Sequence, residues 1–280
     1  MADLNPPSSL PNAAPLSSDS LNGPARVTAF AALFAAIRFL TRLPVPQTTT
    51  SAEHAARQLR AGVVAFPLVG MLIGLISAAV LWLASYLWPL YIAVLLMLAV
   101  EALVTGAFHE DAVADYCDAF GGGWSRDDIL RIMKDSRQGT YGVLGLVLAV
   151  SLRAALLMSL SGPLLYAALV ASATWGRLVI LFVMWLVPPV VDRSSLAKDV
   201  ASQVTRGEVG RAALLASPGL VIWVLLDPLA ALGVVLVTAA FLLWYRPHLL
   251  HTIQGVTGDC LGMSCYAGQL IVLLMATAGR

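Results

Sequence analysis

Charge is what this chain has least of. Only 12% of its 280 residues are Asp, Glu, Lys or Arg, whereas 59% are hydrophobic. Soluble domains contain about a quarter charged residues, so this composition excludes an ordinary water-soluble fold and indicates a protein of the lipid bilayer. A basic tract is also missing, and the formal net charge is only +1. The sequence therefore predicts no nucleic-acid partner.

Cysteine is scarce as well. The chain has three cysteines, Cys117, Cys260 and Cys265, and no Cys-x-x-Cys spacing of the kind that binds metals. We expect all three to be reduced and packed inside the protein, with no redox or metal-binding role.

The first 25 residues lack a basic segment followed by an apolar run, so they do not read as a signal peptide. They are rich in Pro, Ser, Asn and Ala, which predicts a disordered tail. Residues 27–40 are apolar apart from Arg38 but are too short to cross a bilayer. They predict an interfacial or half-inserted helix that Pro44 and Pro46 end.

The rest of the chain contains apolar stretches of about the length of a membrane span. A helix needs about 20 apolar residues to cross the hydrocarbon core. The pattern predicts an all-α integral membrane protein, a polytopic bundle of about six to seven transmembrane helices, with one catalytic domain over residues 26–280. The stretches run over 62–88, 89–108, 141–160, 164–187, 212–226, 229–245 and 260–279.

The segments that connect these stretches alternate between tight turns and long polar loops. If each stretch crosses the bilayer once, all the long segments lie on one side of the membrane. The tight turns contain no Lys or Arg, whereas the long segments contain many. Cytoplasmic loops carry an excess of basic residues, so we predict that the long segments face the cytoplasm. The tight turns are Trp88-Pro89, Ser161-Gly162-Pro163 and Asp227-Pro228, and the long segments are 46–61, 109–140, 188–211 and 246–259.

Acidic residues are concentrated in one of these regions, since half of the chain's sixteen lie between Glu101 and Asp135. Asp111, Asp115 and Asp118 have the spacing i, i+4, i+7, which places them on one face of a helix. Like charges so arranged repel one another near hydrocarbon unless a cation neutralises them. Mg²⁺ prefers oxygen ligands and is often shared with substrate phosphates. The pattern favours a Mg²⁺ site over a solvated acidic face.

Two residues near this face have open roles. Glu101 lies within or near the end of a span, where it is either an additional metal ligand or a polar contact between helices. His109 borders the acidic face and is either a general base, a hydrogen-bond donor to phosphate or a structural residue.

Basic residues near the acidic face are candidate phosphate contacts. Lys134 and Arg137 flank small residues in a loop, and a guanidinium binds phosphate with two hydrogen bonds. Asp135 in the same loop and Asp259 at the start of the last apolar stretch are further candidate metal ligands.

Two arginines lie within apolar stretches, where a charge indicates a functional site. Arg177 is a candidate phosphate contact, and Arg153 is either functional or paired with Glu101 for structural reasons. Elsewhere, Ser125 followed by Asp128 resembles a capping box at the start of a short helix.

An ordered set of sequence segments resembles the adenosylcobinamide-GDP ribazoletransferase family, also called the cobalamin (5′-phosphate) synthase family. The resemblance covers residues from about 30 to the end of the chain. The segments are Phe39-Leu-Thr-Arg42-Leu-Pro44-Val-Pro46, Phe66-Pro67-Leu-Val-Gly70, Gly106-Ala-Phe-His109-Glu-Asp111-Ala-Val-Ala-Asp115-Tyr-Cys-Asp118, Met133-Lys-Asp135-Ser136-Arg137-Gln-Gly139-Thr140-Tyr-Gly142 and Thr257-Gly258-Asp259-Cys-Leu-Gly262.

This resemblance implies a reaction. Members of the family join adenosylcobinamide-GDP to α-ribazole or its 5′-phosphate, and they release GMP with adenosylcobalamin or its phosphate. They are Mg²⁺-dependent, multi-pass proteins of the bacterial inner membrane. The resemblance assigns the metal to Asp111, Asp115, Asp118, Asp135 and Asp259, and phosphate contacts to Arg137 and Arg177. Association with other enzymes of cobamide assembly is a further expectation.

The chain departs from the family in its last helix, where many members carry glutamates and this chain has Tyr266 and Gln269. Two other classes remain open. A CDP-alcohol or polyprenyl transferase also uses clustered aspartates at a span end, but the first kind requires an Ala-Arg pair that is missing here. A cation transporter would carry its carboxylates near the middle of several spans.

Overall fold

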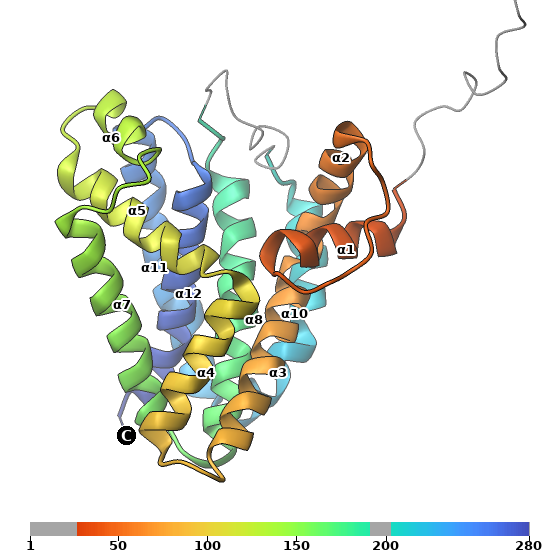
Figure 1. The fold of residues 1–280 in the computed structure, drawn as a ribbon, viewed down its shortest axis with the longest axis vertical. Coiled ribbons are helices and arrows are strands. Elements are labelled where there is room, and N and C mark those ends of the chain that lie inside the picture. Colours follow the sequence, from red (N-terminus) through yellow and green to blue (C-terminus); the bar gives the residue numbers. More distant parts are fainter. Residues whose placement is uncertain (1–26, 191–202, 280) are drawn as a thin grey trace, which may run out of the picture.

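The computed structural model describes residues 27–190 and 203–279, and most of them are helical (Figure 1). Six helices are long and apolar enough to cross a membrane, or seven if one bent pair counts as a span. This confirms the predicted membrane bundle, whereas the predicted tail over 1–25 lies outside the described residues. The six spans are Ala52–Ala84, α7 (Thr140–Met158), α8 (Gly162–Leu186), α10 (Arg206–Leu226), α11 (Pro228–Thr252) and α12 (Gly258–Thr277).

Several helices extend beyond the apolar stretches that predict them. The first span consists of α2 (Ala52–Gly62), the short η2 (Val63–Ala65) and α3 (Phe66–Ala84), although only its second half is apolar. α10 begins at Arg206 and α11 continues to Thr252. Hydrophobicity marks only the part of a helix that lies in lipid. The hydrogen-bonded helix continues into the polar region, as where a capping box from Thr205 begins α10.

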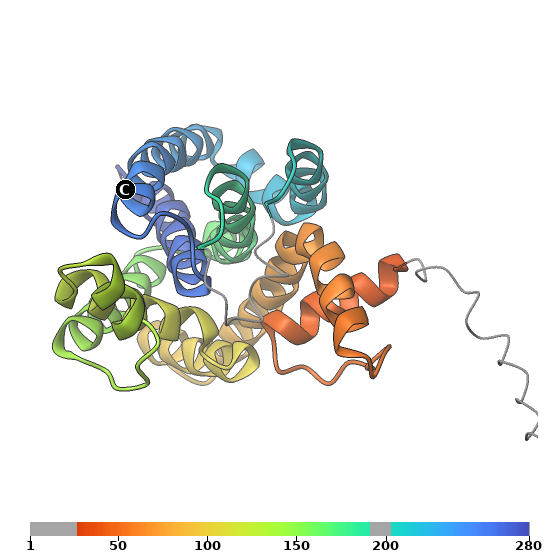
Figure 2. The ribbon, with the colours of Figure 1, turned by 90° about the horizontal axis from the view of Figure 1, so that it is seen from above.

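α8 lies at the centre of the bundle, where it packs against α12, α3 and α10 (Figure 2). Helices in lipid approach closely where small residues meet. A Cβ added to Gly74 of α3 would lie 2.8 Å from the Cα of Val170, and one on Gly176 would lie 2.6 Å from the carbonyl oxygen of Cys265. Glycine is therefore required at both helix crossings.

The two ends of the bundle differ. Tight turns at one end join α3 to α4 (Leu90–Thr105), α7 to α8 and α10 to α11, and the C-terminus lies there too (Figure 1). The other end carries α1 (Ala29–Leu40), α2, α5 (Phe108–Gly122) and α6 (Arg126–Ile132), and we call it the polar end. This arrangement agrees with the predicted alternation of short and long joints. α1 is the short helix predicted over residues 27–40.

The chain turns sharply between α4 and α5, whose axes differ by 89°. Gly106 (φ +72°) and Ala107 (φ +55°) make the turn in the left-handed region. Glycine adopts this conformation freely, whereas alanine does so at a cost of about 1 kcal/mol. The turn lays α5 across the polar end of the bundle (Figure 1). α5 is the helix that the spacing of Asp111, Asp115 and Asp118 predicts.

Candidate active site at the polar end

The three aspartates of α5 differ in their surroundings. Asp111 is exposed, Asp115 is half-buried and Asp118 is buried. The helical spacing does place them along one side of α5, as predicted. Their neighbours on other helices give each carboxylate a different role.

Asp118 holds the beginning of α7. Its two carboxylate oxygens accept the backbone N–H groups of Gly139 (2.5 Å) and Gly142 (2.7 Å). Gly139 is the N-cap of α7, where an anion is favoured by the free N–H groups and the helix dipole. A Cβ on Gly142 would lie 2.3 Å from Oδ2 of Asp118, so a glycine is required there. In this structure Asp118 is used as a structural support.

Asp259 is half-buried at the start of α12, the helix that packs against the part of α5 carrying Asp111 and Asp115. Asp115 and Asp111 are near enough for their charges to act on Asp259. α5 and α12 approach so closely that a Cβ on Gly262 would lie 2.3 Å from that of Ala112. Asp115 accepts one hydrogen bond from Nε2 of Gln138 (2.8 Å). Among the described residues no cation pairs with this acidic group, which we define as Asp111, Asp115 and Asp259.

The loop between α6 and α7 brings basic side chains to the same end. Arg137 binds both oxygens of Asp135 through its Nε and Nη2 atoms, with a shortest distance of 2.7 Å. These bonds lower the pKa of Asp135 to about 2. The Arg137 side chain is nevertheless 87% exposed. Lys134 is exposed on the same loop. α6, which precedes the loop, has Ser125 as its N-cap, and the Ser125 hydroxyl accepts the N–H of Asp128, which is one of the two hydrogen bonds of the predicted capping box.

Glu101 lies in the core and contacts Arg153. Both of its oxygens accept hydrogen bonds from Nη2 of Arg153 (2.8 and 2.9 Å), and Ser77 donates a third (2.8 Å). Glu101 and Arg153 are 3% and 1% exposed, so the pair joins α4 to α7 away from water. Of the two roles that the sequence leaves open for each residue, the structure shows the polar contact between helices.

His109 and Arg177 form a second buried pair. Nη2 of Arg177 lies 3.5 Å from Nδ1 of His109, and both side chains are almost fully buried. A guanidinium only donates hydrogen bonds, so Nδ1 of His109 is the acceptor in this contact. General-base catalysis by His109, one of the roles that the sequence leaves open, stays a prediction. Arg177, predicted as a phosphate contact, is buried in the bundle and contacts His109 there.

The two pairs belong to one buried polar cluster beneath α5. Nη1 of Arg153 lies 3.8 Å from Glu110, and its guanidinium lies over the ring of Tyr266, 5.8 Å from the centroid. Gln269 is buried in the same region of α12, since a Cβ on Gly176 would lie 2.8 Å from its Cγ. The two positions where the chain departs from the resembling family therefore lie at this cluster. Five buried atoms of this cluster have no hydrogen-bond partner among the described residues: His109 Nε2, Glu110 Oε2, Arg153 Nε, Arg177 Nε and Gln269 Oε1.

Two residues of this region were not predicted from the sequence. Glu110 turns toward Arg153 although it stands between His109 and Asp111. The helical period was the available signal, because neighbouring residues point about 100° apart around a helix axis. Gln138 contacts Asp115 across a loop, and no local pattern predicts such a contact.

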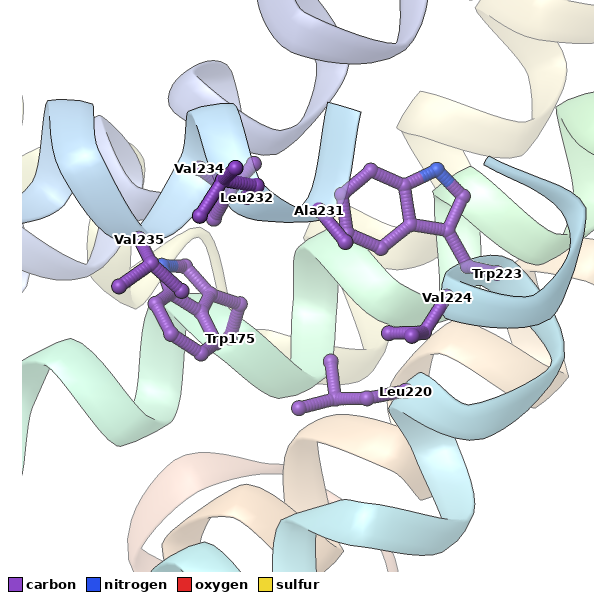
Figure 3. Close-up of a pocket in the computed structure, with 8 residues that line it drawn as sticks. All are labelled: Trp175, Leu220, Trp223, Val224, Ala231, Leu232, Val234 and Val235. Carbon is purple, nitrogen blue, oxygen red and sulfur yellow. The ribbon is translucent and has the colours of Figure 1, made fainter. Parts of the chain in front are cut away.

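A pocket of about 270 Å³ lies between α8, α10 and α11 (Figure 3). Its lining contains no charged residue, and the indole of Trp175 donates to Thr238 beside it (3.0 Å). An apolar pocket among membrane helices does not suit a phosphate, so we keep it apart from the candidate site. Its lining residues are Trp175, Leu220, Trp223, Val224, Ala231, Leu232, Val234 and Val235.

Fold and site together define a class: a multi-pass helical membrane protein with carboxylates and basic side chains gathered at one end. The family model described as cobalamin-5-phosphate synthase matches residues 32–277. This chain therefore belongs to the cobalamin-5-phosphate synthase family, which confirms the resemblance seen in the sequence.

Individual relatives agree. The adenosylcobinamide-GDP ribazoletransferase of Leptothrix cholodnii is 39% identical over 256 residues, which cover 88% of this chain and 94% of the relative. The protein of that name from Shewanella frigidimarina is 38% identical over 258 residues, or 88% and 93% of the two chains. That from Shewanella putrefaciens is 36% identical over 247 residues, or 85% and 92%. No solved structure gives a significant match.

Proposed function

We propose that this protein joins adenosylcobinamide-GDP to α-ribazole or its 5′-phosphate and releases GMP. Its family and the names of its relatives support the substrates. The observation that carries the site is the nearness of Asp111, Asp115 and Asp259 on two packed helices, with no ion pair to a described cation. Family membership and the gathering of these acids at one end disfavour the lipid-transferase and cation-transporter alternatives.

We propose that this acidic group binds Mg²⁺. Among the described residues there is no group of three or more His, Cys, Asp or Glu side chains close enough together to hold a metal ion, so the three carboxylates of the acidic group do not converge on one point. Mg²⁺ does not require such a group, because it keeps several waters and is bound by one or two carboxylates together with substrate phosphates. The donor set of Asp111, Asp115 and Asp259 fits that chemistry. A bound Mg²⁺ would neutralise negative charge on the pyrophosphate.

The other predicted metal ligands have different roles in this proposal. Asp118 holds α7, Asp135 orients Arg137, and Glu101 neutralises Arg153 in the core. Each of these carboxylates already accepts short hydrogen bonds from protein donors. The acidic group is less engaged, and it is therefore the part of the predicted set that we assign to the metal.

The products define the transfer step. A ribose hydroxyl oxygen forms a bond to the cobinamide-linked phosphorus while the hydroxyl loses its proton. The bond from that phosphorus to the bridging oxygen breaks, and GMP leaves with the bridging oxygen. Negative groups must approach one another, so positive side chains are the main catalytic need. Lys134 and Arg137 are exposed on the loop whose Gln138 donates a hydrogen bond to Asp115 of the acidic group. We assign these two basic residues to the binding of the substrate phosphates.

We place the polar end in the cytoplasm and the protein in the bacterial inner membrane. The tight turns at the other end carry no Lys or Arg, whereas the segments at the polar end carry many.

The test is turnover by purified protein in lipid with adenosylcobinamide-GDP, α-ribazole and Mg²⁺, followed as GMP release. We expect EDTA to abolish turnover, and Asp115→Asn and Asp259→Asn each to lower it by about tenfold to a hundredfold or more. Asp127→Asn is the matched control, because Asp127 is an exposed acid of α6 with a 93% exposed side chain. No product from folded wild-type protein would refute the reaction. Turnover that needs Mg²⁺ but survives both site variants would place the metal elsewhere.

A further inference from the structure

Arg42 follows α1 in a segment whose backbone is fixed on both sides. The N–H of Arg42 donates to the carbonyl of Val104 at the end of α4 (2.7 Å). Thr41 donates to the carbonyl of Ile37 through both its N–H (2.8 Å) and its hydroxyl (2.7 Å). The N–H of Leu43 in turn donates to the Thr41 hydroxyl (3.2 Å). Three consecutive residues are therefore held in place next to the corner between α4 and α5.

The Arg42 side chain packs on that corner. A Cβ added to Gly106 would lie 2.4 Å from Nε of Arg42, 2.9 Å from Cζ and 3.0 Å from Nη2. Phe39, one turn earlier, contacts Phe108 edge to face at 5.4 Å, which fixes α1 against the first residue of α5. The guanidinium is thus placed at the start of the helix that carries Asp111 and Asp115.

Nothing in the described chain neutralises Arg42. It is exposed, and none of the carboxylates described forms an ion pair with it. It does not stabilise α5 either, because the start of a helix carries a partial positive charge and favours an acid. Five other arginines of the polar end have acidic partners: Arg57 with Glu53, Arg60 with Glu208, Arg126 with Asp127, Arg131 with Asp128 and Arg137 with Asp135. Arg38, Arg206, Arg211 and Arg246 form no ion pair with a described carboxylate either, so the position of Arg42 at the corner is what distinguishes it.

We propose that Arg42 is a further substrate-binding residue, which holds an anionic phosphate group of the substrate at the corner between α4 and α5. This inference rests on the proposed function. The corner lies against α12, the helix whose first turn carries Asp259, since a Cβ on Gly262 of α12 would lie 4.0 Å from the carbonyl oxygen of Phe108. A planar guanidinium with five donors is suited to phosphate. Gly106 then has two functions, to make the turn and to leave room for Arg42.

The first test compares Arg42→Gln and Arg42→Lys with the wild type and with Arg38→Gln, a control at an exposed arginine of α1. Binding of the coloured substrate adenosylcobinamide-GDP is measured by equilibrium dialysis in lipid nanodiscs, with Mg²⁺ and with EDTA, beside KM and kcat. We expect Arg42→Gln to raise Kd and KM about tenfold to a hundredfold, as for loss of a charged hydrogen bond, with a smaller change in kcat. Arg42→Lys should lie between, and Arg38→Gln should stay within about twofold of the wild type.

The second test uses the corner itself. Gly106→Ala and Gly162→Ala both place alanine at a positive φ, +72° and +60°, but only the first adds a Cβ that meets a side chain. We expect Gly106→Ala to raise KM as Arg42→Gln does and the double variant to be no worse than either. Gly162→Ala should change stability without changing KM.

The outcomes separate the two proposals. Wild-type turnover with an unchanged Kd and KM in folded Arg42→Gln protein would overturn the role of Arg42 and leave the proposed reaction standing. Fully additive effects of Arg42→Gln and Gly106→Ala would also overturn it, because the two changes would then act on different contacts. A wild type that neither binds the substrate nor turns it over would overturn the proposed reaction and this inference together.

Discussion

Glu101 and Arg153 show how two opposite charges are accommodated inside the membrane-spanning part of the bundle. Each is almost fully buried, and each supplies what the other lacks. Burying one charge alone is costly, whereas a hydrogen-bonded pair is tolerated. Ser77 and Glu110 complete the surroundings, so the pair lies within a polar cluster rather than in lipid.

We predict that Glu101→Gln destabilises the protein by about 3 kcal/mol or more, because it leaves Arg153 buried without its main partner. The double change Glu101→Gln with Arg153→Met should regain much of this loss. The measurement is unfolding in detergent by heat or denaturant. If the stability losses of the two single changes simply add in the double variant, the pairing is contradicted. If Glu101→Gln protein has normal stability but a weakened dependence of activity on Mg²⁺, Glu101 is a metal ligand instead.

Asp135 leads to a prediction about pH. Arg137 lowers its pKa to about 2, below the value in an unfolded chain. Any stability it contributes is therefore present above about pH 4 and is lost only as the pH falls through about 2. We expect the pH profiles of activity for Asp135→Asn and wild type to be parallel between about pH 5 and 9. A change of shape in that range would show that Asp135 titrates near the reaction.

Among the helices, α5 is the one that joins the core to the surface. One side of it carries His109 and Glu110 into the buried cluster, and another presents Asp111 and Asp115 to α12. Its far end holds α7 through Asp118. This division follows from the 89° turn, because a straight continuation of α4 would have placed the same acids along a membrane span.

The structural role of Asp118 and the proposed metal-binding role of Asp115 should therefore be distinguishable by experiment. We predict that Asp118→Asn lowers the free energy of unfolding by about 1–3 kcal/mol, since a buried charged acceptor for two N–H groups is lost. Asp115→Asn should change stability little and act on turnover. Unfolding curves and Mg²⁺ titrations of both variants provide the comparison. Equal effects of the two variants on both measurements would refute the division of roles.

The bundle as a whole has one end of tight turns and one polar end (Figure 1). The acidic group, the basic loop and Arg42 all belong to the polar end. A large, charged substrate can reach such a surface without entering hydrocarbon, where an isolated charge is costly. Sidedness in the membrane thus decides which compartment supplies the substrates.

Sidedness is open to a labelling experiment in cells. We predict that Ser161→Cys, in the exposed turn before α8, reacts with a membrane-impermeant maleimide from outside the inner membrane. Trp124→Cys, at a position that is 96% exposed at the polar end, should react only after the membrane is opened. The native cysteines, two buried and one half-buried, set the background signal. The reverse pattern would move the polar end out of the cytoplasm.

Composition and local spacing are enough to establish the membrane class, the approximate number of spans and the family. Long apolar runs allow few structures, because lipid offers no partner for backbone hydrogen bonds and so requires helices. The spacing of Asp111, Asp115 and Asp118 is likewise enough to place them on one side of a helix. Local rules of this kind act over a few residues and are visible in the order of the chain.

The packing of the bundle, by contrast, determines which of these acidic residues lie close together and which partners they bind. Asp115 comes near Asp259, and Asp118 binds the N–H of Gly139, because separate helices pack side by side. Glu101 meets Arg153 for the same reason, and Arg42 reaches Gly106 because α1 lies against the corner after α4. Such contacts join residues distant in the chain, so they depend on the tertiary structure and leave no local pattern in the sequence.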